Sequence, residues 1–137
     1  MPSQLDESEI ENALKAVLGN ASLGLPIAWP NRSAPNTRPY LDVEFVDSVR
    51  EGGALKGQAE IERIEATMVV TVAVDNDGHT TTANDYAQQV AALYPEGTKI
   101  NITNGQICMM LPNILKGFEA LGHWRVPVRM PYMVSRV

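Results

Sequence analysis

The stretch WRVPVRMPY, residues 124–132, decides the fold class because its apolar and polar side chains alternate strictly. Successive side chains of a β-strand point to opposite faces, so the apolar positions predict one buried face. These positions are Trp124, Val126, Val128, Met130 and Tyr132. Pro127 and Pro131 share one parity, so both missing N–H donors point to the same lateral side of the strand. The stretch therefore predicts a C-terminal strand that forms a sheet edge on its proline side.

Two further strands are predicted upstream. Residues 40–49 alternate between an apolar and a mainly polar set, which favours a half-buried strand. Residues 61–74 are rich in β-branched side chains, so they predict a long second strand that begins near Ala59. The glycine-rich segment Arg50–Gly57 lies between them and predicts a mobile hairpin loop.

Apolar residues at helical spacing predict two amphipathic helices. The first covers about residues 4–18, with Ser3 and Asp6 as a capping pair. The second is about thirteen residues long, with Thr82 and Asp85 as its capping pair, and it ends at Pro95 and Gly97. Each helix has one apolar stripe, so each is expected to pack on a sheet.

The remaining segments predict short connections. Asn104-Gly105, flanked by residues 99–103 and 106–110, predicts a tight hairpin. Residues 114–121 predict another strand, whereas four prolines between Asn20 and Pro39 leave room only for a short one at residues 27–29. We therefore expect one α+β domain over residues 1–137, a mostly antiparallel sheet with two helices packed on one face.

The composition restricts the possible partners. The 137 residues are 45% hydrophobic and 20% charged, which is typical of a soluble globular domain. The formal net charge of −5 disfavours sequence-specific nucleic-acid binding, which requires clustered Lys and Arg. No basic head followed by a long apolar run is present, so neither a signal peptide nor a membrane partner is expected.

No reactive motif emerges from the sequence. His79, His123 and the lone Cys108 do not have metal-ligand spacing, and the glycines of residues 52–57 lack the Lys-Ser or Lys-Thr of a phosphate loop. A Gly-x-Ser-x-Gly elbow is missing, and Asp75-Asn76-Asp77-Gly78 is more typical of a turn than of a calcium loop. We therefore expect no catalytic residue, cofactor or metal, and no enzyme.

Taken together, these segments resemble the tail terminator and tail completion proteins of phages, a group of lambda-like minor tail proteins that prophages also encode. The resemblance rests on an N-terminal helix, the Pro-rich residues 26–39, a Tyr-Leu-x-Val strand at residues 40–45, and a glycine-rich loop. It continues through the long strand at residues 64–74, a helix that ends in an aromatic-Pro-x-Gly corner at residues 94–97, and the C-terminal strand. It would cover residues 7–134.

The resemblance implies a structural protein of the virion tail, assembled in the cytoplasm of the bacterial host. Its partners would be further copies of itself in a homohexameric ring, the tail tube protein and the head-tail connector protein. The ring would end tube polymerisation and provide the head-joining surface. An edge strand and two loops would supply the contacts between subunits or with the tube. The candidate interface residues are Asn31, Arg32, Arg38, Arg50, Glu51, Leu55, Lys56, Arg125 and Arg129.

Two alternative functions and two alternative residue roles stay open at this point. A head-tail connector or neck protein would share the small size, the α+β composition and the ring. A small-molecule binding or enzymatic domain would need a group of converging polar side chains that the sequence does not indicate. Trp29 and Trp124 are expected in the core, with a subunit contact as the alternative, and Arg125 and Arg129 could be solvated instead of paired with a neighbour.

Overall fold

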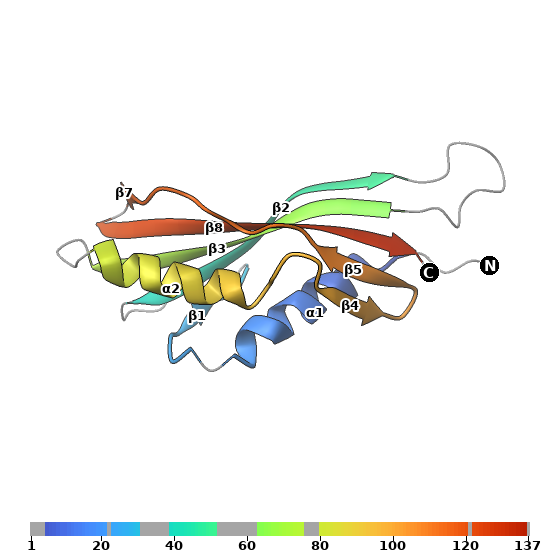
Figure 1. Ribbon diagram of the computed structural model, residues 1–137, viewed down its shortest axis with the longest axis horizontal. Helices are drawn as coiled ribbons and strands as arrows, with labels where there is room; N and C mark the ends of the chain where they lie inside the picture. The colour runs from blue at the N-terminus through green and yellow to red at the C-terminus, as the bar shows by residue number, and fades with distance from the viewer. Residues whose placement is uncertain are drawn as a thin grey trace.

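The computed structural model of the chain describes residues 5–21, 23–30, 39–51, 63–75, 80–120 and 122–136. The elements in chain order are α1 (Glu7–Gly19), β1 (Ile27–Ala28), β2 (Tyr40–Glu51), β3 (Arg63–Asp75), α2 (Thr80–Ala92), β4 (Lys99–Ile102), β5 (Gly105–Met109), β6 (Asn113–Ile114), β7 (Phe118–Ala120) and β8 (His123–Arg136) (Figure 1). The strands form one sheet in the order β1-β2-β3-β8-β5-β4, and β6 and β7 also pair with β8. Two helices and one large sheet within the described ranges confirm the α+β class.

The long strands β3 and β8 lie at the centre of this sheet. They pair antiparallel from Arg63 with Ser135 to Asp75 with His123. On β3 the even-numbered side chains from Ile64 to Val74 are buried, and their partners on β8 belong to the same core cluster or pack against it. Leu41 and Val43 extend this face onto β2, and both helices add side chains to the same cluster: Ile10, Leu14, Leu18, Ala83, Ala87 and Val90. The predicted alternation of the C-terminal strand and the predicted long strand at residues 61–74 are both confirmed, the latter from Arg63 within the described residues.

Both helices begin at other residues than predicted. In α1 the carboxylate of Asp6 accepts a hydrogen bond of 2.9 Å from the backbone N–H of Ser8, so Asp6 is the N-cap and the helix begins at Glu7. Ser3, the predicted cap, lies outside the described residues. The predicted length of α2 is correct, but the helix begins at Thr80, so Thr82 lies inside it and cannot cap it. Local capping patterns located the helices but not their first residues.

The prediction of a sheet edge at the C-terminal strand is wrong. The carbonyl oxygens of Pro127 and Pro131 accept hydrogen bonds of 2.9 Å from the N–H groups of Leu115 and Met110, on the side of β8 that faces away from β3. On this side β7, β6 and β5 pair in succession with residues 123–125, 128–129 and 132–136 of β8. The gaps between these short partners fall at the two prolines, which cannot donate to a neighbour. The prolines therefore interrupt the neighbouring strand instead of excluding it.

The same interruption explains why the predicted strand at residues 114–121 is present only in part, as Ile114 of β6 and as β7. The chain pairs with β8 only at β6 and β7, and between them it runs along β8 without regular pairing. We call residues 110–118 the strap (Figure 1). It replaces the continuous strand that the apolar composition had indicated.

The predictions upstream of β3 have mixed outcomes. The short strand at residues 27–29 is confirmed as β1, which pairs parallel with Leu41 and Asp42 of β2. β2 continues to Glu51, past the predicted end, with an irregular register between Val46 and Val49 where Asp47 adopts a positive φ of 57°. The rest of the predicted loop, residues 52–57, and most of the Pro-rich segment, residues 31–38, lie outside the described residues.

The predicted hairpin is confirmed as β4 and β5, but its turn lies one residue earlier than expected. Ile102 pairs with Gly105, so Thr103 and Asn104 form the turn. Gly105 has no positive φ, so the turn does not require a glycine at this position. The glycine is required for space, because a Cβ there would lie 2.5 Å from the carbonyl oxygen of Ser135 and 2.6 Å from Cδ2 of Leu5. This glycine allows β8 and the chain before α1 to approach the hairpin closely.

A substitution at Gly105 tests this close approach. We expect Gly105→Ala to lower the free energy of unfolding by about 1–3 kcal/mol, because the backbone of β8 must move to admit the methyl group. The matched control is Gly19→Ala, whose Cβ would meet only the Trp29 ring at 3.8 Å and which should be neutral or slightly stabilising at the end of α1. Urea denaturation of both variants measures the difference, and equal stability of the two would contradict this role.

Candidate interaction surfaces

The structure describes four of the nine predicted interface residues: Arg50, Glu51, Arg125 and Arg129. The other five lie outside the described residues: Asn31, Arg32, Arg38, Leu55 and Lys56. Glu51 is the last residue of β2, and its side chain is not described. The three described arginines each contact an acidic side chain of the same subunit, and they do not form one common site.

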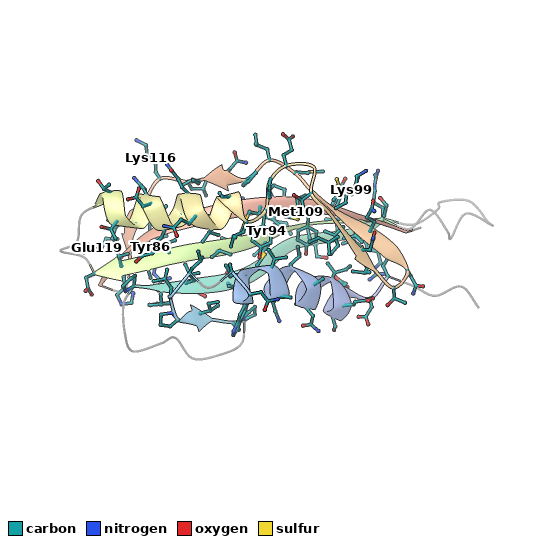
Figure 2. The ribbon with its side chains drawn as sticks, turned by 60° about the horizontal axis from the view of Figure 1, so that its bottom comes forward. Tyr86, Tyr94, Lys99, Met109, Lys116 and Glu119 are labelled. Atoms are coloured by element: carbon teal, nitrogen blue, oxygen red, sulfur yellow. The ribbon has the colours of Figure 1, made fainter. Side chains whose placement is uncertain are left out.

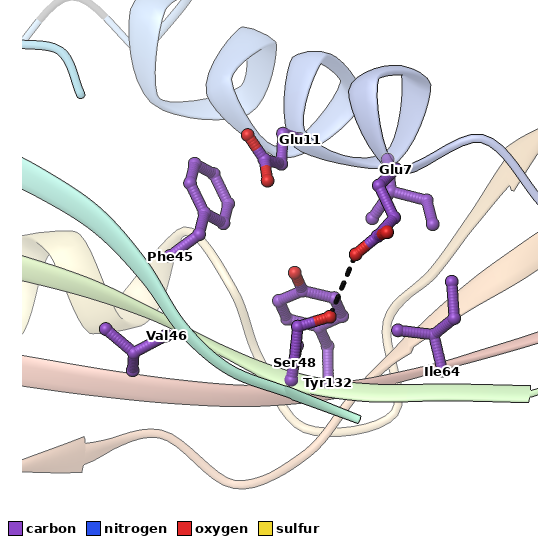
Figure 3. A pocket seen from close by; sticks show the side chains of 9 residues that line it. Glu7, Glu11, Phe45, Val46, Ser48, Ile64 and Tyr132 are labelled. Carbon is purple, nitrogen blue, oxygen red and sulfur yellow. Dashed lines mark hydrogen bonds between the residues drawn. The ribbon is translucent and has the colours of Figure 1, made fainter. Parts of the chain in front are cut away.

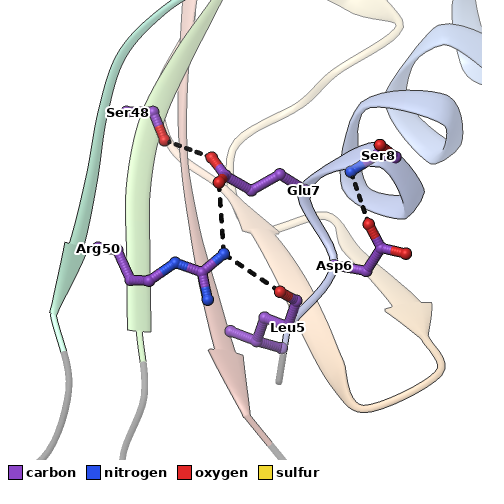
Figure 4. A network of polar contacts seen from close by, with 6 residues as sticks. All are labelled: Leu5, Asp6, Glu7, Ser8, Ser48 and Arg50. Carbon is purple, nitrogen blue, oxygen red and sulfur yellow. Dashed lines mark hydrogen bonds and ion pairs between the residues drawn. The ribbon is translucent and has the colours of Figure 1, made fainter. Parts of the chain in front are cut away.

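Arg50 connects the end of β2 to the start of α1 (Figure 4). Its Nη2 donates a hydrogen bond of 3.1 Å to the carbonyl oxygen of Leu5 and lies 3.4 Å from Oε2 of Glu7. The hydroxyl of Ser48 donates to the other oxygen of Glu7 at 2.9 Å. The side chains of Arg50 and Glu7 are 34% and 52% exposed, so water screens this ion pair and it stabilises the fold only weakly.

Arg125 crosses the sheet on the face opposite the core. Its Nη2 donates a hydrogen bond of 3.0 Å to the hydroxyl of Tyr40, and its Nη1 lies 3.4 Å from Oδ2 of Asp42. Ala73 of β3 lies in register between Arg125 and Tyr40, and its small side chain leaves room for the guanidinium. The side chain of Arg125 is only 12% exposed and that of Asp42 is 30% exposed, so this pair is largely shielded from water.

Arg129 makes a similar but more exposed contact on the same face. Its Nη2 donates a hydrogen bond of 3.0 Å to Oδ2 of Asp47, the residue with positive φ in β2. The two side chains are 39% and 67% exposed. Both arginines therefore lie away from the core, as the sequence predicts, with an acidic partner in their own subunit. Their role between subunits stays a prediction.

A small hollow lies where α1 meets β2, β3 and β8 (Figure 3). The carboxylates of Glu7 and Glu11, the Phe45 ring and the Tyr132 phenol line it, and its volume is about 40 Å³. Burial, with the negative charges of Glu11 and Glu7, raises the pKa of the Tyr132 phenol above its ordinary value. Binding sites for small molecules usually have volumes of about 300–1,000 Å³, so this hollow can hold water but no substrate.

Figure 2 shows the side chains of the described residues around the ribbon. Within the described ranges, no group of three or more His, Cys, Asp or Glu side chains could hold a metal ion. None of the described helices is long and apolar enough to span a membrane.

The strap carries most of the exposed apolar surface. Six large hydrophobic side chains of the described residues are at least 40% exposed, and five of them belong to the strap. These five are Met110, Leu111, Ile114, Leu115 and Phe118, with exposed fractions of 41%, 58%, 40%, 41% and 46%. Such a concentration is typical of a surface that contacts another protein. The sequence pattern did not reveal this surface, because it predicts Met110 in a hairpin and Ile114, Leu115 and Phe118 in a strand of the sheet.

Two open hollows lie beside the strap. One, of about 580 Å³, lies between α2 and the strap and is lined by Asn84, Gln88, Ile114, Leu115, Lys116, Gly117 and Trp124. The Trp124 ring packs so closely on Gly117 that a Cβ there would lie 2.5 Å from the indole nitrogen. The other, of about 250 Å³, reaches from Met110 and Pro131 to Val49 of β2. Trp124 is therefore partly buried against the core and also borders the strap surface.

The two arginine contacts on the outer face differ in burial, and this difference can be tested. We expect Arg125→Ala to lower the free energy of unfolding by about 1–3 kcal/mol, because it leaves the Tyr40 hydroxyl and the partly buried Asp42 without their donor. Arg129→Ala removes an exposed pair and should cost less than about 1 kcal/mol. Thermal and urea unfolding compare the two, and an equal loss of stability would contradict the burial argument.

The fold of the whole chain is similar to that of two solved proteins. A solved protein without a descriptive name superposes with a TM-score of 0.74 at 17% identity, over 98% of this chain and 99% of that chain. A chain from the virion of a native gene transfer agent particle gives a TM-score of 0.67 at 15% identity, over 97% and 99%. No curated protein matches the sequence significantly. The family model described as phage tail terminator protein matches residues 9–132. The chain therefore belongs to the phage tail terminator family and is a structural protein of a phage tail.

Proposed function

We propose that this protein forms a ring at the end of the tail tube, ends tube polymerisation and provides the surface to which the head is joined. The observation that carries the proposal is the family match, which spans residues 9–132 and therefore nearly the whole domain. The similarity in fold to a chain of a gene transfer agent virion supports a place in a tailed particle. We further propose that the ring is a hexamer, and that it assembles in the cytoplasm of the bacterial host.

The physical properties of the subunit are compatible with a ring. Identical subunits close into a ring through heterologous contacts, in which two different surfaces of the subunit meet. The described part of the chain has two unlike lateral sides: β2, which has only the short β1 as an outer neighbour, and the side beyond β8, where the strap and the edge strand β4 lie. The formal net charge of −5 would let a channel surrounded by such subunits pass DNA without binding it tightly. The partners would be further copies of the chain, the tail tube protein and the connector protein.

Disruption of the gene in its phage tests the termination role. We expect tails of irregular or excessive length, because no ring would stop the addition of tube subunits, and plasmid-borne wild type should restore a uniform length. Negative-stain electron microscopy measures the length distribution. Tails of normal length beside unattached heads would instead indicate a head-tail connector and would refute the termination role.

We also propose that the loops at residues 31–39 and 50–57 contact the tube or the neighbouring subunit. Deletion of residues 52–56 should leave the domain folded but unable to restore tail length, because it removes Leu55 and Lys56 from this contact. Circular dichroism monitors the fold, and complementation of the disrupted phage monitors function. A matched variant with Gly and Ser at positions 52–56 keeps the loop length, and it separates the effect of length from the effect of the side chains. Normal tail lengths with both variants would show that the loop is dispensable.

A further inference from the structure

We infer that the strap is the surface on which a second copy of this chain docks, with the outer part of β2 of that copy as its counterpart. This inference rests on the proposed ring. Five of the six exposed large hydrophobic side chains of the described residues belong to the strap, within nine consecutive positions. Contact with another protein would remove this apolar surface from water, which is the main favourable contribution to association.

Hydrogen bonds and side-chain packing within the subunit fix the conformation of the strap. The N–H groups of Met110 and Leu115 donate to the carbonyl oxygens of Pro131 and Pro127, and β6 and β7 pair with β8 on either side of Lys116. The indole of Trp124 packs directly on Gly117. Because its backbone is already ordered, the strap would lose little conformational entropy on docking.

The charges of the two lateral sides indicate which partner fits. The strap contains a single charged residue, Lys116, which is exposed and makes no ion pair with a described residue. On β2, Asp42 and Asp47 already pair with Arg125 and Arg129. Glu44 lies between these two aspartates, and it is exposed without an ion pair to any residue in the described ranges. An unpaired cation on the strap and an unpaired anion on β2 are complementary between two copies.

The placement of the two charges favours a heterologous contact. β2 and the strap lie on opposite sides of the central pair β3 and β8. In a head-to-tail arrangement, Lys116 would therefore face one neighbouring copy and Glu44 would face the other. Val49 also belongs to β2 and is 53% exposed, but it borders the same hollow as Met110 of its own strap, so it does not distinguish the two sides. The β2 side therefore offers an acidic group, Glu44, to the basic strap of the next copy. An isologous contact would instead bring two Lys116 side chains together.

Charge reversal tests the contact. We expect Lys116→Glu and Glu44→Lys each to raise the dissociation constant of self-association at least about tenfold at low salt, because each brings like charges together. The double variant should restore association. Lys99→Glu is the matched control, since Lys99 is an exposed lysine on β4 that pairs in register with Cys108 and lies outside the strap, and it should associate like the wild type. Leu111→Ser with Phe118→Ser should also weaken association at least about tenfold, without loss of the fold, because both side chains are already exposed.

Sedimentation velocity over a range of concentrations measures association, and circular dichroism verifies the fold of each variant. Cysteine cross-linking extends the test to isolated tails: Lys116→Cys with Glu44→Cys, in a Cys108→Ser background, should give a ladder of covalent oligomers on oxidation. Each single cysteine variant should give no ladder. If the free chain stays monomeric, the cross-linking of isolated tails is the measurement that tests the contact.

The outcomes separate this inference from the proposed function. Strap variants that associate and restore tail length like the wild type would overturn the inference and leave the termination role intact. No ladder on tails, together with loss of binding of strap variants to purified tubes, would assign the strap to the tube protein instead and would also overturn the inference. Only the tail lengths of the disrupted phage bear on the proposed function itself.

Discussion

The antiparallel pairing of β3 with β8 is the interaction on which the rest of the structure depends. The two strands pair along their whole shared length, from Arg63 with Ser135 to Asp75 with His123. This register brings the apolar side chains of both strands to one face, where residues of α1 and α2 join them in one core cluster. A shift by one residue would turn every one of these side chains to the opposite face, so the buried alternation fixes the register. The opposite face is then available for the arginine contacts and for other proteins.

The two prolines of β8 link this core to the candidate function. They leave the β3 side of the strand intact and prevent continuous pairing on the other side, where Leu115 and Met110 donate to the proline carbonyls instead. The neighbouring chain is therefore divided into short strands and the strap, and the apolar side chains of the strap remain partly in water. A continuous strand could have buried more of its surface in the sheet. In a tail terminator subunit, which must contact other proteins to function, an ordered apolar segment at the side of the sheet is a surface suited to assembly.

Polar side-chain contacts connect α1 and β8 to the outer strands of the sheet. Glu7 binds Ser48 and Arg50 of β2, and Glu9 accepts hydrogen bonds of 3.0 and 2.6 Å from the backbone and hydroxyl of Thr103 in the β4–β5 turn. The start of α1 thus connects two distant parts of the curled sheet. Arg125 and Arg129 act likewise between β8 and β2. Residues that a sequence identifies as candidates for contacts between subunits can therefore also make contacts inside one.

The sequence by itself determined the α+β class, the alternation of the long strands, the approximate helices and the hairpin, because these depend on local periodicity and on the chemistry of single residues. It also determined that Pro127 and Pro131 face the same side. Only the tertiary structure decided that β8 is central, that Gly105 serves a close approach to Ser135, and that the strap is exposed. Strand order, backbone proximity and solvent exposure depend on which distant segments meet, and the pattern of a single segment contains no information about its partner.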